Sequence, residues 1–192
     1  QRLIEQVLQN IEETQEAIEN TNEQYDGITT LIKMVGELNE QYNQKEIDSL
    51  IYYPLIDYDL ELNIDIINEA KDNGRIGEIK NDSLRIALYK LSSMVNLIEQ
   101  RILIANDNNS NYLVPYFYKN ISFRTLNSSL SESYRKQIGD SKLEKSNYQR
   151  IMMDREFENL LYTRLTYSEE ILSMYQDYNE YLEYIKQLLN KE

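Results

Sequence analysis

Two stretches, one at each end of the chain, repeat at the seven-residue spacing of helices that pack side by side. In the first stretch, two series of mostly apolar residues follow one another at intervals of three and four residues. This spacing places both series along one side of an α-helix, and it predicts a helix over about residues 2–43, roughly 60 Å long at a rise of 1.5 Å per residue. The two series are Ile4, Ile11, Ile18, Tyr25 and Ile32, and Val7, Thr14, Thr21, Ile28 and Val35.

The last stretch has the same spacing and predicts a second long helix over residues 152–190. Arg164 and Ser168 are polar members of its series, as Thr14 and Thr21 are in the first stretch. Polar residues at these positions favour a stalk over a dry, self-sufficient coiled coil. The apolar members are Phe157, Leu161, Ile171, Tyr175, Tyr178, Leu182, Ile185 and Leu189.

The middle of the chain carries signals for shorter helices. Residues 45–53 predict a short helix that Pro54 ends, because the residue before a proline is pushed away from helical geometry. A helix is also predicted over residues 60–73 from its apolar spacing, and Gly74 can then take the positive φ that ends it.

A third internal helix is predicted over residues 83–105, with an N-cap supplied by Asn81, Asp82 or Ser83. Residues 106–150 are predicted to form a loop: 106–111 are polar and lack a helical period, and 112–123 have strand-like content but also fit an irregular segment. Residues 127–147 are polar and form either a short helix with loops or a partly mobile stretch. Gly27 and Gly36 are weak points of the first long helix.

These elements predict an all-α fold. Two long terminal helices and two shorter helices between them favour an antiparallel four-helix bundle in which the terminal helices extend as a stalk. The chain has only five glycines and two prolines, too few for the turns of an all-β fold, and no linker divides it. We therefore expect a single helical domain over residues 1–192.

The composition excludes several functions. The chain has no histidine and no cysteine, which removes imidazole bases, thiolate nucleophiles and the usual zinc ligands. The formal charge of -13 makes nucleic acid an unfavourable partner. We expect no catalytic residue, no metal, no cofactor and no enzyme activity.

Two short sets of oxygen-bearing side chains have the spacing that begins a calcium-binding loop. Both lack the glycine and the glutamate that such a loop needs later, so ordinary turns and a solvated helix start are favoured. A carboxylate-based metal or hydrolase site, or a serine–lysine pair such as Ser141 and Lys142, remains an alternative. The two sets are Asp57, Asp59 and Glu61, and Asp107, Asn109 and Asn111.

An aromatic group within the predicted loop is the strongest candidate for contact with a partner. Tyrosine is over-represented at interfaces because it combines a large apolar ring with a polar end. The candidate partner-binding residues are Tyr112, Tyr116, Phe117 and Tyr118.

The segment from Asn68 to Arg85, with its Asn-Gly turn and its Asn-x-x-Leu-Arg ending, resembles an uncharacterised membrane-anchored helical family common in Bacteroidota. The Glu-Phe-Glu-Asn-Leu-Leu stretch from Glu156 to Leu161 is similar to a later element of that family. Members have a basic N-terminus and one hydrophobic helix before a helical domain. The resemblance implies an inner-membrane anchor upstream of this chain and a domain in the periplasm.

The resulting hypothesis is a non-enzymatic extracytoplasmic domain that binds a partner protein or senses a ligand. The first alternative is a cytoplasmic coiled-coil scaffold that self-associates through the first helix, by Ile4, Ile11 and Ile18.

Overall fold

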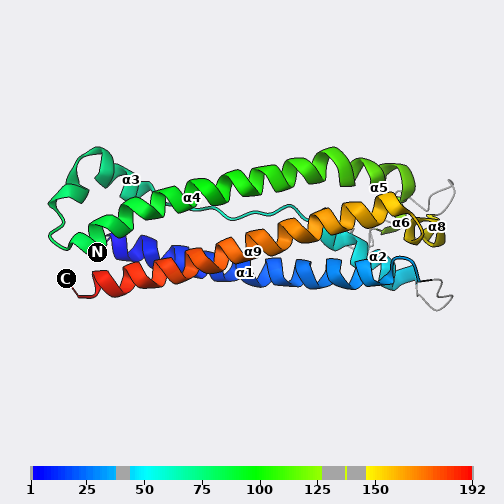
Figure 1. Ribbon diagram of the computed structural model, residues 1–192, viewed down its shortest axis with the longest axis horizontal. Helices are drawn as coiled ribbons and strands as arrows, with labels where there is room; N and C mark the ends of the chain where they lie inside the picture. Colours follow the sequence, from blue (N-terminus) through cyan, green and yellow to red (C-terminus); the bar gives the residue numbers. More distant parts are fainter. Residues whose placement is uncertain (1, 38–43, 127–136, 138–145, 192) are drawn as a thin grey trace. The chain divides into compact units, whose positions relative to one another are not determined.

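A computed structural model describes residues 2–37, 44–126, 137 and 146–191 (Figure 1). Within these ranges the regular elements are helical and no strand occurs, which confirms the all-α prediction. The long helices are α1 (Arg2–Met34), α4 (Asp82–Asn108) and α9 (Arg155–Leu189). The short helical elements are α2 (Gln44–Tyr52), η1 (Tyr53–Leu55), α3 (Asp65–Asp72), η2 (Arg75–Glu78), η3 (Asn109–Leu113), α5 (Val114–Asn120), α6 (Phe123–Leu126) and α8 (Tyr148–Met152).

The chain divides into two compact units. Unit 1 comprises Gln1–Glu23, Tyr58–Ile104 and Ser168–Glu192, and unit 2 comprises Gln24–Asp57 and Ala105–Tyr167. Three of the boundaries fall inside α1, α4 and α9, so no change of composition marks them in the sequence.

The first long helix is shorter than predicted. Helix α1 ends at Met34, and Gly36 has a φ of 84°, a left-handed conformation that suits glycine and stops a helix. The amide of Gly36 donates to the carbonyl oxygen of Met152 at 2.8 Å instead of continuing the helix. The remainder of the predicted helix, residues 38–43, lies outside the described residues.

The predicted buried side of α1 is confirmed for one series as far as Ile28, whereas most members of the other series are half-buried. Val7, Thr14, Thr21 and Ile28 are buried, but Ile11 is the one buried member of the isoleucine series. The second buried series lies one residue before the predicted isoleucine series. It was not predicted, because two of its members are polar. Its buried members are Asn10, Ala17, Gln24 and Leu31.

The segment of residues 56–64 explains why polar side chains of α1 are buried. This segment was predicted to be helical from residue 60, but it has no regular structure, and α3 begins only at Asp65 (Figure 1). Burial along it alternates, with Tyr58, Leu62 and Ile64 inside and the acidic residues between them exposed. A period of two is the pattern of an extended chain. An extended segment without a sheet needs other partners for its backbone.

In unit 1, side chains of α1 and α9 form hydrogen bonds with this segment, one of them to its backbone. The amide of Asn10 donates to the carbonyl oxygen of Asn63 at 2.7 Å, and the amide of Gln6 donates to the side-chain oxygen of Asn63 at 2.7 Å. The hydroxyls of Tyr58 and Ser168 share a hydrogen bond of 2.5 Å. The polar seam residues therefore hold the extended segment.

In unit 2, buried polar side chains likewise donate hydrogen bonds to backbone carbonyl groups, including those at and just before the start of this segment. Gln24 donates from its amide to the carbonyl oxygens of Tyr53 at 3.0 Å and Ile56 at 2.6 Å. The guanidinium of Arg164, only 2% exposed, donates to the carbonyl oxygens of Ile56 and Ala105. Backbone carbonyl groups thus accept hydrogen bonds from two nitrogens of a buried charged group.

The seam of α9 was predicted almost completely. Its apolar members are buried, as are the polar members Arg164 and Ser168, and the one difference is at the end, where Leu188 rather than Leu189 faces inward. The helix begins at Arg155, because the carboxylate of Asp154 accepts a hydrogen bond from the amide of Glu156 at 2.8 Å and caps the first turn.

The predicted loop over residues 106–150 is largely helical where it is described. Helix α4 continues to Asn108, followed by η3 (a π-helical turn), α5, α6 and α8. The side-chain amide of Asn111 donates to the carbonyl oxygen of Asp107 at 2.7 Å, so a polar residue here bonds within the helix rather than ending it. Pro115 is the second residue of α5, which follows directly on η3. Residues 127–136 and 138–145, including Ser141 and Lys142, lie outside the described residues.

No helix in the described ranges is long and apolar enough to cross a membrane.

Candidate functional site

The four predicted contact residues do not form one surface. Tyr112 and Tyr118 are 61% and 72% exposed, whereas Tyr116 and Phe117 are buried. The correction follows from helix geometry, because consecutive residues of α5 point in different directions around its axis.

Tyr116 and Phe117 belong to the apolar core of unit 2. The ring of Phe157 lies 5.7 Å from Tyr116, nearly parallel to it, and 5.9 Å from Phe117. The Tyr116 hydroxyl donates to Asp154 at 2.8 Å, and this hydrogen bond lowers the pKa of the Asp154 carboxyl. Burial raises the pKa of Tyr116. These two residues support the fold rather than a surface.

The two candidate calcium sets are not assembled into a cation site. Asp57 and Asn109, one from each set, are hydrogen-bonded to each other at 2.9 Å. Asp59 and Glu61 are exposed. Among the residues that the structure describes, no group of three carboxylates is arranged to hold a metal ion.

A pocket of about 370 Å³ opens in unit 1 between the start of α1, α3 and η2. Leu3, Ile66 and Ala70 form its apolar wall, and Arg2, Glu69 and Arg75 form its polar rim. All three charged residues are exposed, so none of them is desolvated to grip a ligand.

The most distinctive surface of unit 1 is an apolar face on α4, called the α4 face below. At 3.6 residues per turn, Ile86, Leu97 and Ile104 lie within about 20° of one another around the helix axis, and Tyr89 and Leu103 flank them on one side, about 60° and about 100° from Ile86. The core residues Leu84, Ala87, Leu88, Leu91, Val95 and Ile98 occupy the opposite side. The α4 face consists of Ile86 (65% exposed), Tyr89 (44%), Leu97 (59%), Leu103 (62%) and Ile104 (49%).

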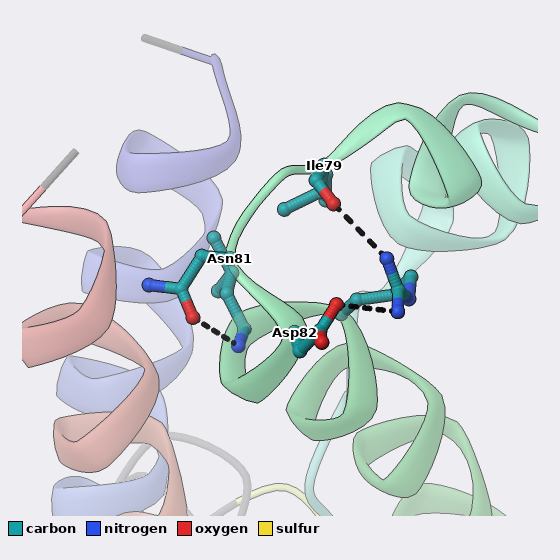
Figure 2. Close-up of polar contacts among 5 residues, drawn as sticks. Ile79, Asn81 and Asp82 are labelled. Carbon is teal, nitrogen blue, oxygen red and sulfur yellow. Dashed lines mark hydrogen bonds and ion pairs between the residues drawn. The ribbon is translucent and has the colours of Figure 1, made fainter.

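The turn before α4 fixes where this helix starts. The side-chain oxygen of Asn81 accepts a hydrogen bond from the amide of Leu84 at 3.1 Å, which confirms the predicted N-cap (Figure 2). Arg85 donates to the carbonyl oxygen of Ile79 at 3.3 Å and to the carboxylate of Asp82 at 2.5 Å (Figure 2). Gly74 has the predicted positive φ, at 72°.

The charged residues beside the α4 face are engaged by neighbouring groups. The Lys90 ammonium lies 4.7 Å from the centre of the Tyr181 ring, and Arg101 forms an ion pair with Glu170 on α9. The face therefore presents mainly apolar side chains, with little local charge.

Sequence reasoning missed this face because it predicted only the bounds and the N-cap of this helix, and not which of its sides is exposed. The available signal was that this helix has more large apolar residues than its buried side contains. Ile86, Tyr89, Leu97 and Ile104 lie outside the row of core residues on α4. A helix with apolar residues on two opposite sides needs a partner on each.

The helix 1 series offers less exposed apolar surface. Ile11 is buried, and Ile4 and Ile18 are half-buried.

No family model, curated protein or solved structure matches this chain. The resemblance to the membrane-anchored family of Bacteroidota stays a prediction.

Proposed function

We propose that this chain is a non-enzymatic helical domain that binds a partner protein through the α4 face. The observation that supports this is the row of five large apolar side chains exposed along one helix. Exposed apolar patches on soluble domains mark interaction sites, because covering them removes apolar surface from water.

The proposal includes an anchor upstream of residue 1 and a periplasmic location, both taken from the resemblance. It also includes the finer architecture predicted above, an antiparallel four-helix bundle with the terminal helices as a stalk. Protease added outside intact inner membranes should digest the domain of the full-length protein, and protection there would favour the cytoplasmic alternative.

Photo-crosslinking tests the binding surface. A photoreactive amino acid at Asn96, beside the α4 face, is expected to give a discrete adduct in the full-length protein in its host. The same group at the exposed Gln176 on α9 serves as the control. The proposal fails if both positions give the same pattern, or if Leu97→Glu leaves the Asn96 adduct unchanged.

Tyr112 and Tyr118 are a second proposed contact, in unit 2, supported by their exposure. Crosslinking from Lys119 would test them separately.

A further inference from the structure

The α4 face has the spacing of a coiled-coil seam. The positions that face outward follow one another in steps of four and three residues, the spacing that lets two helices pack along their length. Half of these positions are polar, so only some alignments of two such helices bring apolar residues together. The outward positions are Ile86, Lys90, Ser93, Leu97, Gln100 and Ile104.

About position 95, the outward positions pair Ile86 with Ile104, Lys90 with Gln100, and Ser93 with Leu97. An antiparallel second copy of α4 would place Ile86 against Ile104 of the second copy, and Leu97 against the small Ser93 of the second copy. On the flank, Tyr89 would meet Leu103 of the second copy. All five residues of the α4 face would thus find apolar or small partners. Such self-complementarity is what a two-fold interface requires.

We infer that the partner of the α4 face is a second copy of this chain, with the two α4 helices packed antiparallel about a two-fold axis near Asn96. This inference rests on the proposed function, since it names the partner of the same surface. Unit 1 alone carries the interface.

Lys90 selects the antiparallel orientation. In a parallel pair, Lys90 would face Lys90 of the second copy, and two ammonium groups would repel each other. In the antiparallel pair, Lys90 faces the uncharged Gln100 of the second copy, and each Lys90 ammonium keeps its place beside the Tyr181 ring of its own chain.

The interface is small and the copies repel at long range. From Ile86 to Ile104 the face spans about 27 Å, too short for one helix pair to reach the roughly 800 Å² per partner of a standard stable interface. Each copy also carries a formal charge of -13. The dimer is therefore weak in solution and strengthened by salt, which screens the repulsion. Copies attached to one membrane would meet at a higher effective concentration.

Sedimentation of the chain over a range of concentrations tests the association. We expect a monomer–dimer equilibrium that shifts toward dimer between low and physiological salt. Leu97→Glu should weaken dimerisation by at least about tenfold, because it places two carboxylates in an apolar contact. Leu8→Glu is the matched control, since Leu8 is 44% exposed on α1 of the same unit. Ser93→Glu should repeat the effect without removing an apolar side chain. A monomer at every concentration and salt level would overturn the inference.

Cysteine crosslinking tests the orientation, because the chain has no cysteine of its own. Lys90→Cys and Gln100→Cys keep all five residues of the α4 face. With a short bismaleimide, the antiparallel pair should crosslink only when the two variants are mixed. Crosslinking of Gln100→Cys with itself, in a chain that keeps Lys90, would show a parallel pair and overturn the inference.

Two further results separate this inference from the proposed function. If the chain stays monomeric but Leu97→Glu abolishes the adduct from Asn96, another protein is the partner, and only the self-association fails. If the chain instead binds vesicles of anionic or zwitterionic lipid in a manner that depends on Leu97, the α4 face is a membrane contact and both proposals fail.

Discussion

Unit 2 is built around an apolar and aromatic cluster, whereas unit 1 buries several polar side chains and leaves a row of apolar ones exposed on α4. In unit 2, Phe117, Phe157 and Leu161 are fully buried. In unit 1, Asn10, Thr14 and Ser168 occupy comparable interior positions. The proposed function assigns the exposed row on α4 to contact with a partner, whereas the unit 2 cluster serves cohesion.

The largest expected effect is at the centre of the unit 2 cluster. Phe117→Ala should lower the free energy of unfolding by about 3–5 kcal/mol, because it leaves a cavity among buried rings. Urea denaturation followed by circular dichroism measures this. Tyr118→Ala, at the exposed neighbour, should change it by less than about 0.5 kcal/mol. Equal losses of stability in the two variants would contradict the assignment of Phe117 to the core and Tyr118 to the surface.

The buried guanidinium is expected to come next. Arg164→Leu should cost about 2–4 kcal/mol, because the carbonyl groups of Ile56 and Ala105 lose a charged donor. Arg155→Ala is the control on the same helix, since its ion pair with Glu158 is largely exposed. Hydrogen exchange should show faster exchange in unit 2 for Arg164→Leu alone. A variant as stable as the parent would contradict the anchoring role.

High pH should weaken the interior of unit 1. Burial raises the pKa of Tyr175 and Tyr178 above the ordinary value of 10.0. Below pH 10 both tyrosines are protonated in the folded and the unfolded chain. Above it the unfolded chain ionises first, so stability falls by about 1.4 kcal/mol per pH unit for each residue. Urea midpoints from pH 8 to pH 11 measure this, and the slope should decrease in Tyr175→Phe. If the fall of stability with pH is as steep in Tyr175→Phe as in the parent, ionisation of Tyr175 does not contribute to it.

A polar anchor of unit 1 should have a smaller effect than the unit 2 core. Asn10→Leu should cost about 1–3 kcal/mol, because the carbonyl oxygen of Asn63 loses its donor. Thr14→Val should cost less, since the Thr14 hydroxyl bonds only to the carbonyl oxygen of Asn10 in its own helix. If the two variants are equal in denaturation experiments, the extended segment does not depend on Asn10.

The smallest effect on stability is expected at the α4 face. Leu97→Glu should change the free energy of unfolding by less than about 0.5 kcal/mol, because the side chain is already 59% exposed. Measurements at low protein concentration avoid any contribution from association. A large loss would place Leu97 in the core and remove the distinction between the two sides of α4.

The sequence was sufficient for α9 and only partly for α1, for a physical reason. The seam of α9 is mostly apolar, so its pattern alone identifies the buried side. In α1, Asn10 and Gln24 are buried because the segment 56–64 brings carbonyl groups to them. That segment is distant in sequence, and hydrophobicity along α1 cannot reveal it. The apolar/polar alternation from Tyr58 to Ile64 was the available signal, and helical spacing was preferred over it.

The candidate site was less predictable than the fold. The exposure of Tyr112 and the burial of Phe117 depend on how η3 and α5 turn, which the polar composition of residues 106–111 did not indicate. The α4 face could have been found by counting the apolar residues left over after the core was assigned.

The hydrogen bonds that hold the extended segment have a consequence for how this sequence can change over generations. Asn10, Gln24 and Arg164 bind main-chain carbonyl groups, which every amino acid possesses. The segment itself can therefore accept substitutions at its exposed positions, such as Asp59 and Glu61, as long as the alternation is kept. Mutational drift is expected to accumulate in the segment that is held, while the three residues that hold it are constrained.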